Sequence, residues 1–298
     1  MTATPPGATP AVGSTDTVPG AAIVTVSYNS GRYLEEFLRS TADASAAELP
    51  VVVADNDSAD PASLRTMTES LGGNFLELGR NAGYGAAVNR AVAALPDSAV
   101  WVLVSNPDVV LSPGAVDTLL DVAHADPAIG AVGPAIVEPT GEVYPSARLV
   151  PSLRTGLGHA LFANVWPTNP WTRRYRQDDD HGTQRDAGWL SGACLLIRRE
   201  AFDAVGGFDE RYFMYFEDVD LGYRLGAAGW RNVYSPATRV MHVGAHATTS
   251  SSDLMRRAHH ASAYRFLASK YRGWYFWPLR VALRVALGTR ARMHTRGI

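Results

Sequence analysis

The segment from Phe208 to Trp230 crowds carboxylates among aromatic rings, a combination suited to acid–base chemistry. Burying a carboxylate beside apolar rings is costly and raises its pKa, which makes it a better proton acceptor. The segment is therefore predicted to carry a general base, and Glu217 and Asp218 are the candidates because the preceding run YFMYF would bury this pair. The remaining acids are expected to be structural: Asp209, Glu210 and Asp220. The alternative is a solvated acid cluster that complements a helix dipole, an interpretation that suits Asp220 best.

Other polar candidates follow short apolar runs. Asp55 ends VVVAD, and a carboxylate there could accept a hydrogen bond from the imide N–H of uracil or thymine. Asn106 and Asp108 follow WVLVS, where one hard oxygen ligand suits Mg²⁺ or Mn²⁺ held partly by substrate phosphates. His242 ends a later run, and its imidazole tolerates Mn²⁺. Each has a plainer alternative, either turn chemistry after a strand or a structural histidine.

A glycine-rich stretch, GRNAGYGAAVNRA, spans residues 79–91. Its backbone amides and Arg80 could meet a phosphate at the start of a helix. A dinucleotide-binding fingerprint would need Gly or Ala at position 88, which is Val88. The stretch also follows the third predicted strand rather than the first, so a Rossmann dehydrogenase is not expected. A plain glycine-rich connection is the alternative.

The elements that must position these residues alternate in the first half of the chain. Apolar runs predict strands, and helical spacing follows each of them. The strands are expected at 21–27, 50–54, 74–78 and 100–104, and the helices at 32–40, 61–71 and 113–125, with further helical residues after the glycines of 79–93. This alternation predicts a parallel α/β sheet with right-handed crossovers. Ligands bind at the carboxyl ends of such strands, where Asp55, Asn81 and Asp108 would converge.

The second half is less regular. Further strands are expected at 129–137, 189–198, 231–234 and 239–243. Residues 144–188 are rich in Pro, Trp, Arg and Asp and show little periodicity, so a long loop is expected there, with its role left open.

Composition limits the classes of function. The 298 residues are 46% hydrophobic and 19% charged, which is typical of a folded protein. The net charge of −2 argues against general nucleic-acid binding. The single cysteine excludes an intramolecular disulfide and fits a reducing compartment. Residues 1–19 are expected to form a disordered tail without the features of a signal peptide. No apolar run is long enough to span a bilayer, so a cytoplasmic protein is expected.

The C-terminal end is basic. From Leu254 to Ile298 there is no Asp or Glu, but there are ten Lys or Arg residues. The run Tyr271 to Leu287 joins aromatic residues to an apolar face, with Arg280 and Arg284 opposite. This pattern predicts an interfacial helix on the anionic inner face of the plasma membrane. A core-packing or dimer helix with a basic edge is the alternative.

Taken in order, these motifs resemble an inverting family 2 glycosyltransferase of the GT-A fold over roughly residues 20–247. The order is AAIVTVSYNS, VVVADNDSAD, GRNAGYGAAVNRA, SNPDV, the long block from WLSGACLLIRRE to LGYRLGAAGW, and a strand-end histidine. YPSAR, NPWT and RYFMYFEDVDLG point more closely to the rhamnosyltransferase branch found in actinobacteria. That branch moves L-rhamnose from dTDP-β-L-rhamnose to N-acetylglucosamine on a polyprenyl diphosphate, in synthesis of the cell-wall arabinogalactan linker.

The resemblance implies roles by position. The nucleobase and ribose would be bordered by Thr25, Ser27, Tyr28 and Asn29, with Asp55 at the base. The ribose and diphosphate would lie near Arg80, Asn81, Gly83 and Tyr84. Mg²⁺ or Mn²⁺ would be held by Asp108 and His242, with Asn106 in place of the first acid of the usual Asp-x-Asp motif, a departure that weakens the expected metal site. The acceptor would be bordered by Trp189, Ser191 and Gly192. Of the catalytic pair, Asp218 would be the general base and Glu217 its supporting neighbour.

The expected organisation is one Rossmann-like GT-A domain over 20–250, with a mostly parallel sheet and a C-terminal basic helical extension over 251–298. Residues 20–110 would form its nucleotide half and 111–250 its acceptor half.

Three alternatives stay open: a UDP-sugar transferase with another acceptor, a non-catalytic nucleotide- or carbohydrate-binding module, and a nucleotidyltransferase. The last would need a basic glycine-rich loop after the first strand, where this chain has YNSGRY. A homodimer is also compatible with the sequence.

Overall fold

The computed structural model describes residues 20–152, 181–243 and 252–293, with side chains in the last range described for 257–285. The predicted tail over 1–19 and the NPWT motif lie outside the described residues. The strands are β1 (Ala21–Ser27), β2 (Val51–Asp55), β3 (Asn74–Glu77), β4 (Trp101–Ser105), β5 (Val109–Leu111), β6 (Ile129–Val137), β7 (Val143–Tyr144), β8 (Ala147–Arg148), β9 (Arg185–Ala187), β10 (Trp189–Leu190), β11 (Cys194–Arg198) and β12 (Arg231–His242). The helices are α1 (Gly31–Thr41), α2 (Pro61–Ser70), α3 (Tyr84–Ala93), α4 (Ala115–His124), α7 (Arg199–Ala204), α8 (Glu217–Ala227), α9 (Ser252–Lys270) and α10 (Trp277–Met293), with a 3-10 turn η2 (Trp274–Phe276) before α10.

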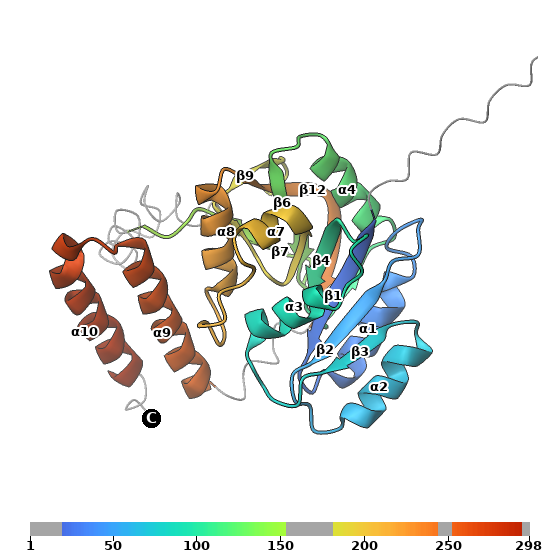
Figure 1. The fold of residues 1–298 in the computed structure, drawn as a ribbon, viewed down its shortest axis with the longest axis horizontal. Helices are drawn as coiled ribbons and strands as arrows, with labels where there is room; N and C mark the ends of the chain where they lie inside the picture. Colours follow the sequence, from blue (N-terminus) through green and yellow to red (C-terminus); the bar gives the residue numbers. More distant parts are fainter. Residues whose placement is uncertain (1–19, 153–180, 244–251, 294–298) are drawn as a thin grey trace, which may run out of the picture.

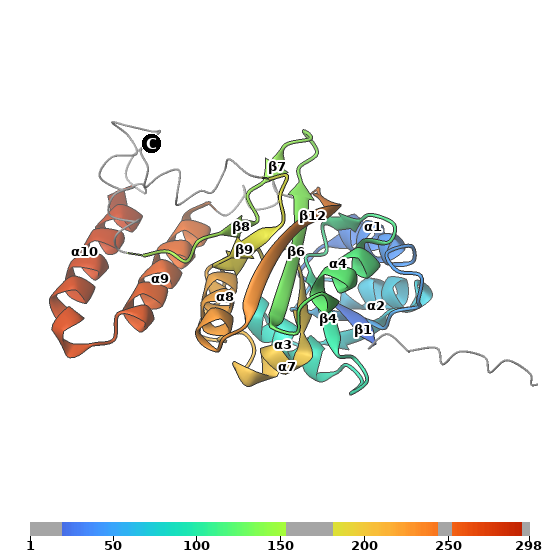
Figure 2. The same cartoon turned by 90° about the horizontal axis from the view of Figure 1, so that it is seen from above.

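A central sheet runs in the order β3-β2-β1-β4-β11-β6-β12-β5. The β1–β2, β1–β4, β2–β3 and β6–β12 pairs are parallel, whereas β11 is antiparallel to both of its neighbours. Helices α1, α2 and α4 cover one face, and α3, α7 and α8 cover the other (Figures 1 and 2). The mostly parallel sheet predicted from the sequence is therefore present, with antiparallel pairing at β11 in its middle and at the short strands β5, β7 and β9.

The two faces of β1 show why these short apolar runs become buried strands. Ile23 packs into the core beside α1 and α4, whereas Val24 packs into the core beside α3. Successive side chains of a strand point to opposite faces, so a strand covered on both sides is apolar throughout. The helix predicted after Asp60 is also present, and the Asp60 side chain accepts a hydrogen bond from the backbone N–H of Ser63 at 3.1 Å.

Two of the predicted strands differ from the structure. Residues 231–242 form one strand rather than two, with a register shift between Ser235 and Arg239 where it pairs with β6. Pro236 lies in this shift, and because proline lacks an N–H it is tolerated in a sheet at such bulges. The predicted strand over 189–198 is divided into β10 and β11, which belong to different sheets. Elements β5, β7, β8, β9 and α7 had no counterpart in the prediction because all are short. The long loop predicted over 144–188 is therefore wrong at β8 and β9, and its middle, 153–180, lies outside the described residues.

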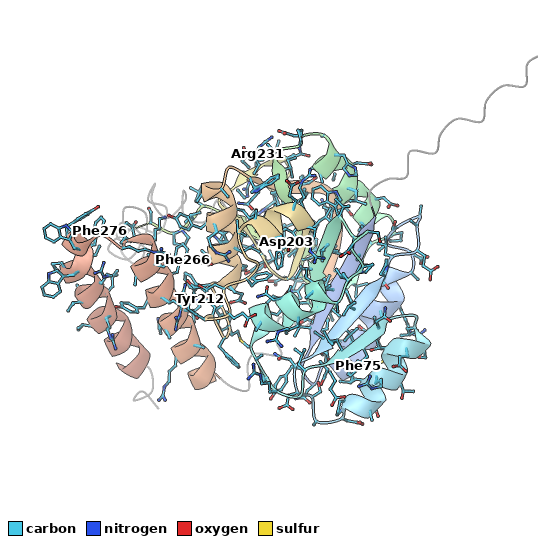
Figure 3. All side chains as sticks on the ribbon, viewed as in Figure 1. Phe75, Asp203, Tyr212, Arg231, Phe266 and Phe276 are labelled. Atoms are coloured by element: carbon cyan, nitrogen blue, oxygen red, sulfur yellow. The ribbon has the colours of Figure 1, made fainter. Side chains whose placement is uncertain are left out.

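The C-terminal helices are attached to the sheet domain through α9. Phe266 is fully buried with Tyr212 and Val219, and Figure 3 shows Tyr212 and Phe266 at this junction. The hydroxyl of Ser262 donates to the carbonyl oxygen of Met214 at 2.9 Å, and the Lys270 ammonium donates to that of Pro151 at 2.8 Å. The predicted helical extension is thus a pair of helices, α9 and α10. None of the helices in the described ranges is both long and apolar enough to cross a membrane.

Candidate functional site

A cavity of about 270 Å³ opens at the carboxyl ends of β1, β2 and β4, and we call it the strand-end cavity. It is lined by Val26, Tyr28, Asn29, Ser30, Tyr33, Asn56, Asn81, Gly83, Tyr84, Asn106, Pro107, Asp108 and Met214. Parallel strands end at one edge of the sheet, which is why residues so far apart in sequence meet here. Its size and polar rim suit part of a nucleotide.

Asn56 organises one wall of the strand-end cavity. Its side-chain amide donates to Oδ1 of Asn81 at 3.0 Å and accepts from the backbone N–H of Ala82 at 2.9 Å. Asn81 Oδ1 also accepts from the backbone N–H of Gly83 at 3.1 Å. Asn56 was not among the predicted site residues, although its position immediately after Asp55 at a strand end was a usable signal.

Three predicted nucleotide residues lie behind this wall rather than on it. Thr25, Ser27 and Asp55 are fully buried, and Ser27 is directly opposite Asp55 in the β1–β2 pairing. Asp55 Oδ2 accepts from the backbone N–H of Ser58 at 3.1 Å, but Asp55 Oδ1 and the Thr25 and Ser27 hydroxyls have no hydrogen-bond partner among the described residues. Buried oxygens without donors are costly, so these atoms could receive donors from a ligand that reaches them.

Gly83 joins the glycine-rich loop to the loop before α8. Its φ of +89° belongs to the left-handed region, and a Cβ added there would lie 2.5 Å from the carbonyl oxygen of Phe213. The next residue, Tyr84, donates its backbone N–H to that same oxygen at 3.1 Å. Only glycine allows this approach without movement of the backbone. The 208–216 loop is therefore fixed against the strand-end cavity.

A second cavity of about 460 Å³ adjoins the first, and we call it the acid cavity. The two cavities share Tyr84, Asn106, Asp108 and Met214. The acid cavity is further lined by Glu138, Tyr144, Ser191, Gly192, Ala193, Tyr215, Glu217, Asp218 and His242. Two ligands bound in adjoining cavities would therefore meet at a shared wall that carries Asp108.

Asp218 is held by backbone donors on both oxygens. Oδ2 accepts from the N–H of Gly192 at 3.1 Å, and Oδ1 accepts from the N–H of Val219 at 2.8 Å. Tyr84 supports the same wall, since its hydroxyl donates to the carbonyl oxygen of Gly192 at 2.7 Å. Glu217 is also buried, and its Oε2 has no hydrogen-bond partner within the described part of the chain.

Burial raises the pKa of both carboxyl groups. Desolvation is the main cause for Glu217, and repulsion from Asp218 adds to it, so that its pKa rises to about 8. Desolvation also raises the pKa of Asp218, while the hydrogen bonds from Gly192 and Val219 act in the opposite direction. Two acids with raised pKa values beside a polar cavity are typical of a proton-accepting site.

The backbone that presents these acids is strained. Tyr215 and Phe216 both have positive φ values, 66° and 67°, although neither is glycine. Each such residue costs roughly 1–3 kcal/mol and persists where the surroundings hold it. Phe216 immediately precedes α8, so the strained pair places Glu217 and Asp218 in the first turn of that helix.

Asp108 and His242 point toward each other across the shared wall. Oδ1 of Asp108 lies 3.0 Å from Nε2 of His242, and both side chains are 17% exposed. Pairing of β12 with β5 brings them together, since His242 pairs with Val109. No cluster of three or more His, Cys, Asp or Glu side chains able to hold a metal ion occurs in the described ranges, so this pair could bind a cation only with ligands from elsewhere.

Most of the predicted site residues line the two cavities, but two more, besides the buried Thr25, Ser27 and Asp55, do not. Arg80 lies outside both linings and is exposed. Trp189 also lies outside both linings; its indole N–H donates to the carbonyl oxygen of Leu149 at 3.2 Å and its Cβ faces Gly222. The acids expected to be structural all have partners: Asp209 pairs with Arg211, Glu210 contacts Asn89 and Asp220 pairs with Arg224.

Several lining residues were not predicted as site residues. Tyr144 belongs to the quoted YPSAR motif, and Tyr215 belongs to the aromatic run before Glu217, so each carried a signal. Met214 belongs to the same run, whereas Glu138 carried no signal, because nothing in its local sequence distinguishes it from a surface residue.

Comparison with known proteins places this geometry in a family. The model for the family described as "Glycosyltransferase like family 2" matches residues 19–264. The N-acetylglucosaminyl-diphospho-decaprenol L-rhamnosyltransferase of Mycobacterium tuberculosis is 47% identical over 291 residues, which cover 95% of this chain and 94% of that protein. Rhamnosyltransferase WbbL of Escherichia coli K12 is 43% identical over 82 residues, which cover 28% of this chain and 31% of that protein.

Solved structures confirm the fold. A mannosyltransferase from Pyrobaculum calidifontis, solved with GDP-Man and Mn²⁺, gives a TM-score of 0.57 at 19% identity and covers 95% of this chain and 77% of its own. GalNAc-T7, solved with UDP, GalNAc and Mn²⁺, gives a TM-score of 0.55 at 15% identity and covers 75% of this chain and 43% of its own. The GT-A fold implied by the resemblance is thus confirmed.

Proposed function

Because the chain belongs to glycosyltransferase family 2, we propose that it transfers L-rhamnose from dTDP-β-L-rhamnose to a hydroxyl of polyprenyl-diphosphate-linked N-acetylglucosamine, with inversion. The observation that carries this proposal is the pair of cavities that meet at Asp108, with the acids on the far side. The 47% identity with the mycobacterial enzyme supports this choice of donor and acceptor.

The strand-end cavity would hold the nucleotide. Tyr28, Asn29 and Asn81 on its lining would border the base, ribose and diphosphate. If the base reaches past Asn56, Oδ1 of Asp55 would accept a hydrogen bond from the imide N–H of thymine. This bond would give the buried oxygen the donor that it lacks among the described residues. The same contact would serve uracil, so a UDP-sugar remains the alternative donor.

The acid cavity would hold the acceptor sugar, with Asp218 as general base. The two backbone hydrogen bonds fix its carboxylate, and desolvation raises its pKa, so it is oriented and basic enough to take a proton from the attacking hydroxyl. Such proton transfer is worth roughly 10²–10⁴ in rate. Glu217 would support Asp218 electrostatically, and Ser191 and Gly192 would border the acceptor.

We propose that Asp108 and His242 hold Mg²⁺ or Mn²⁺ together with the donor diphosphate. A carboxylate oxygen and an imidazole nitrogen converge at the shared wall, and this donor set fits an ion that takes its remaining ligands from phosphate and water. When bound, the ion would offset the charge that grows on the leaving diphosphate. Asn106 lies beside this pair as a neutral neighbour.

The basic C-terminal helices would hold the enzyme on the inner face of the membrane. The acceptor is lipid-linked and the donor is soluble, so attachment would bring the acid cavity to its substrate. The apolar side chains of Trp274, Trp277 and Val285 are exposed at this end of the molecule, as expected for an interfacial segment.

Two measurements test the proposed function. A thermal-shift screen with dTDP, UDP and GDP, each with and without Mn²⁺, should show the largest stabilisation for dTDP with metal. A transfer assay with dTDP-rhamnose and a short-chain, water-soluble diphosphate-linked acceptor should then give the rhamnosylated product. A preference for UDP would favour the alternative donor, and the absence of a response to every nucleotide would favour a non-catalytic module.

A further inference from the structure

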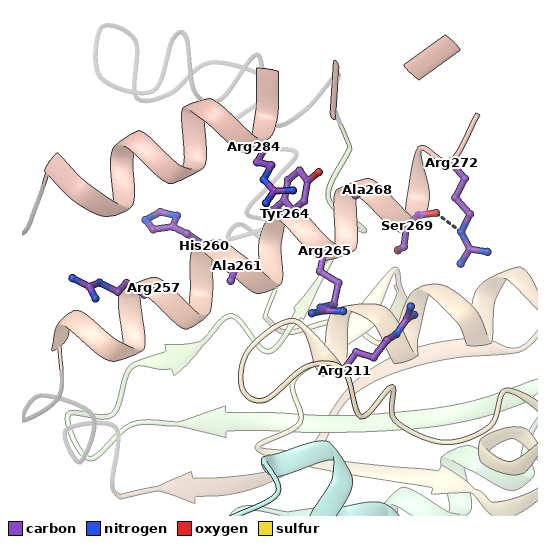
Figure 4. A pocket seen from close by; sticks show the side chains of 10 residues that line it. All are labelled: Arg211, Arg257, His260, Ala261, Tyr264, Arg265, Ala268, Ser269, Arg272 and Arg284. Carbon is purple, nitrogen blue, oxygen red and sulfur yellow. Dashed lines mark hydrogen bonds between the residues drawn. The ribbon is translucent and has the colours of Figure 1, made fainter. Parts of the chain in front are cut away.

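The largest of the cavities described here, about 930 Å³, lies away from both of those above, beside α9 and α10. We call it the arginine groove, and Figure 4 shows the side chains that line it. Five arginines surround it: Arg211 from the loop before α8, Arg257, Arg265 and Arg272 from α9 or its end, and Arg284 from α10. None of its ten lining residues is acidic.

The groove exists because α9 presents small side chains where a packed helix would present large ones. Ala261 and Ala268 lie seven residues apart on the lining face, with Tyr264 between them. Residues at this spacing share one face of a helix. Leucines at the two alanine positions would fill the space toward α10, whereas alanines leave a hollow.

Among the described side chains, most of the positive charge in the groove has no acidic partner. Arg211 is paired with Asp209, but within residues 20–152, 181–243 and 257–285 no carboxylate forms an ion pair with Arg257, Arg265, Arg272 or Arg284. Arg265 lies over the ring of Tyr212 and Arg284 over that of Tyr264, each at 5.9 Å from the ring centroid. These contacts orient the guanidinium groups while leaving them able to bind an anion. Guanidinium groups bind phosphate oxygens in pairs, so a phosphate ligand fits this chemistry.

The surroundings of the groove indicate a lipid phosphate rather than a free one. Arg272 is followed directly by an aromatic segment in which Trp274 is 82% exposed, Tyr275 63% and Trp277 59%. Large exposed aromatic side chains are costly in water and favourable at the headgroup level of a bilayer. Arginines and aromatics side by side therefore match the phosphate and the upper acyl region of the same lipid.

We propose that the arginine groove binds the headgroup phosphate of an anionic phospholipid in the membrane to which the enzyme attaches. The proposal rests on the membrane attachment proposed above and identifies its specific site. A general attraction of a basic tail would depend on net charge alone, whereas this proposal assigns binding to the arginine side chains that line one groove along α9.

Vesicle co-sedimentation of the full chain tests the groove. The triple variant Arg257→Gln, Arg265→Gln, Arg284→Gln removes three groove charges. The control variant Arg39→Gln, Arg65→Gln, Arg90→Gln removes the same charge from α1, α2 and α3, outside the groove, where Arg39 and Arg90 are exposed and Arg65 is half-buried. With vesicles of phosphatidylcholine and phosphatidylglycerol, the groove variant should bind on the order of 100-fold more weakly than the wild type, and the control should bind like the wild type. Vesicles of phosphatidylcholine alone should bind all three proteins weakly.

Three outcomes would overturn the proposal. If the groove and control variants lose vesicle affinity equally, net charge alone would explain binding. If the groove variant binds vesicles like the wild type, the lipid site lies elsewhere. A thermal shift with inorganic phosphate that the groove variant loses would assign the groove to a free phosphate. If the triple variant does not fold, Arg257→Gln alone should still weaken vesicle binding about fivefold, since roughly 1 kcal/mol is expected for each arginine near the surface.

This test is separate from that of the proposed function. The groove variant should still be stabilised by dTDP with Mn²⁺ and should still modify the short-chain, water-soluble acceptor. If the wild type itself fails both nucleotide and transfer assays while the vesicle result holds, the proposed function is wrong and the lipid site stands.

Discussion

The backbone N–H of Gly192 donates a hydrogen bond to Oδ2 of Asp218 at 3.1 Å, and this contact joins the loop between β10 and β11 to the first turn of α8. The opposite oxygen of Asp218 accepts from Val219 at 2.8 Å. One carboxylate is thus oriented by two segments of the chain, while it still lines the acid cavity. The first prediction follows from this arrangement.

Asp218→Asn should lower kcat by about 10²–10⁴ and leave donor binding unchanged, because the amide keeps the shape but cannot take the proton. The measurements are the transfer rate with a soluble acceptor and the thermal shift produced by dTDP with Mn²⁺. Asp203→Asn, on the exposed side of α7, is the matched control and should retain full activity. Near-normal turnover by Asp218→Asn would show that another group is the base.

Glu217→Gln should stabilise the protein at high pH. The folded pKa of Glu217 is about 8, whereas an unfolded glutamate titrates near about 4.3. The native state therefore holds the proton where the unfolded state has released it, so this group's contribution to stability falls as pH rises from about 4 to 8. In Glu217→Gln the stability should therefore fall less as the pH rises. Its Tm should be at least about 2 °C above that of the wild type at pH 8 to 9.

The control for this measurement is Glu200→Gln, an exposed residue of α7 that should leave the pH dependence of Tm unchanged. If the wild type and Glu217→Gln show parallel Tm curves across the whole pH range, Glu217 does not hold a proton in the native state. Asp218 titrates in contact with this group, so the remaining slope in the variant reports on Asp218.

Gly83→Ala should destabilise the protein more than Gly79→Ala. Both glycines have positive φ, +89° and +66°, so both substitutions introduce backbone strain of roughly 1–2 kcal/mol. Only at Gly83 would the new Cβ meet backbone, 2.5 Å from the Phe213 oxygen, whereas nothing lies within 4 Å at Gly79. We expect a further loss of about 1–3 kcal/mol at Gly83, measured by denaturant unfolding, and weaker dTDP binding. If both variants lose the same free energy of unfolding, the 208–216 loop can move away from the new Cβ at position 83.

Asp108→Asn should abolish the extra stabilisation that Mn²⁺ gives to dTDP binding, because the neutral amide is a weaker ligand for a hard cation. His242→Gln should reduce the same increment. The readout is the difference in thermal shift with and without Mn²⁺ at fixed dTDP. His124→Gln, whose ring contacts Trp101 away from both cavities, should behave as the wild type. An unchanged Mn²⁺ increment in Asp108→Asn would place the ion elsewhere.

The sheet and the strand-end residues could be predicted from sequence because their signals are local. Apolar runs followed by polar residues mark the ends of parallel strands, and Asn81 and Asp108 were found in this way. Contacts that depend on distant segments had no such signal. Three such contacts depend on how loops meet in three dimensions: the approach of Phe213 to Gly83, the backbone support of Asp218 by Gly192, and the hydrogen bond of the Trp189 indole to Leu149.

The attachment of α9 limits where this chain can be shortened. The aromatic cluster of Tyr212 and Phe266 is shared between the loop before α8 and the C-terminal helices, and Ser262 bonds to Met214, which lines both cavities. A chain truncated after residue 250, although it keeps every residue proposed to touch substrate, would expose Tyr212 and Val219 to water. A shortened chain should therefore end beyond Lys270, so that α9 keeps its contacts with Tyr212 and Met214 beside the two cavities.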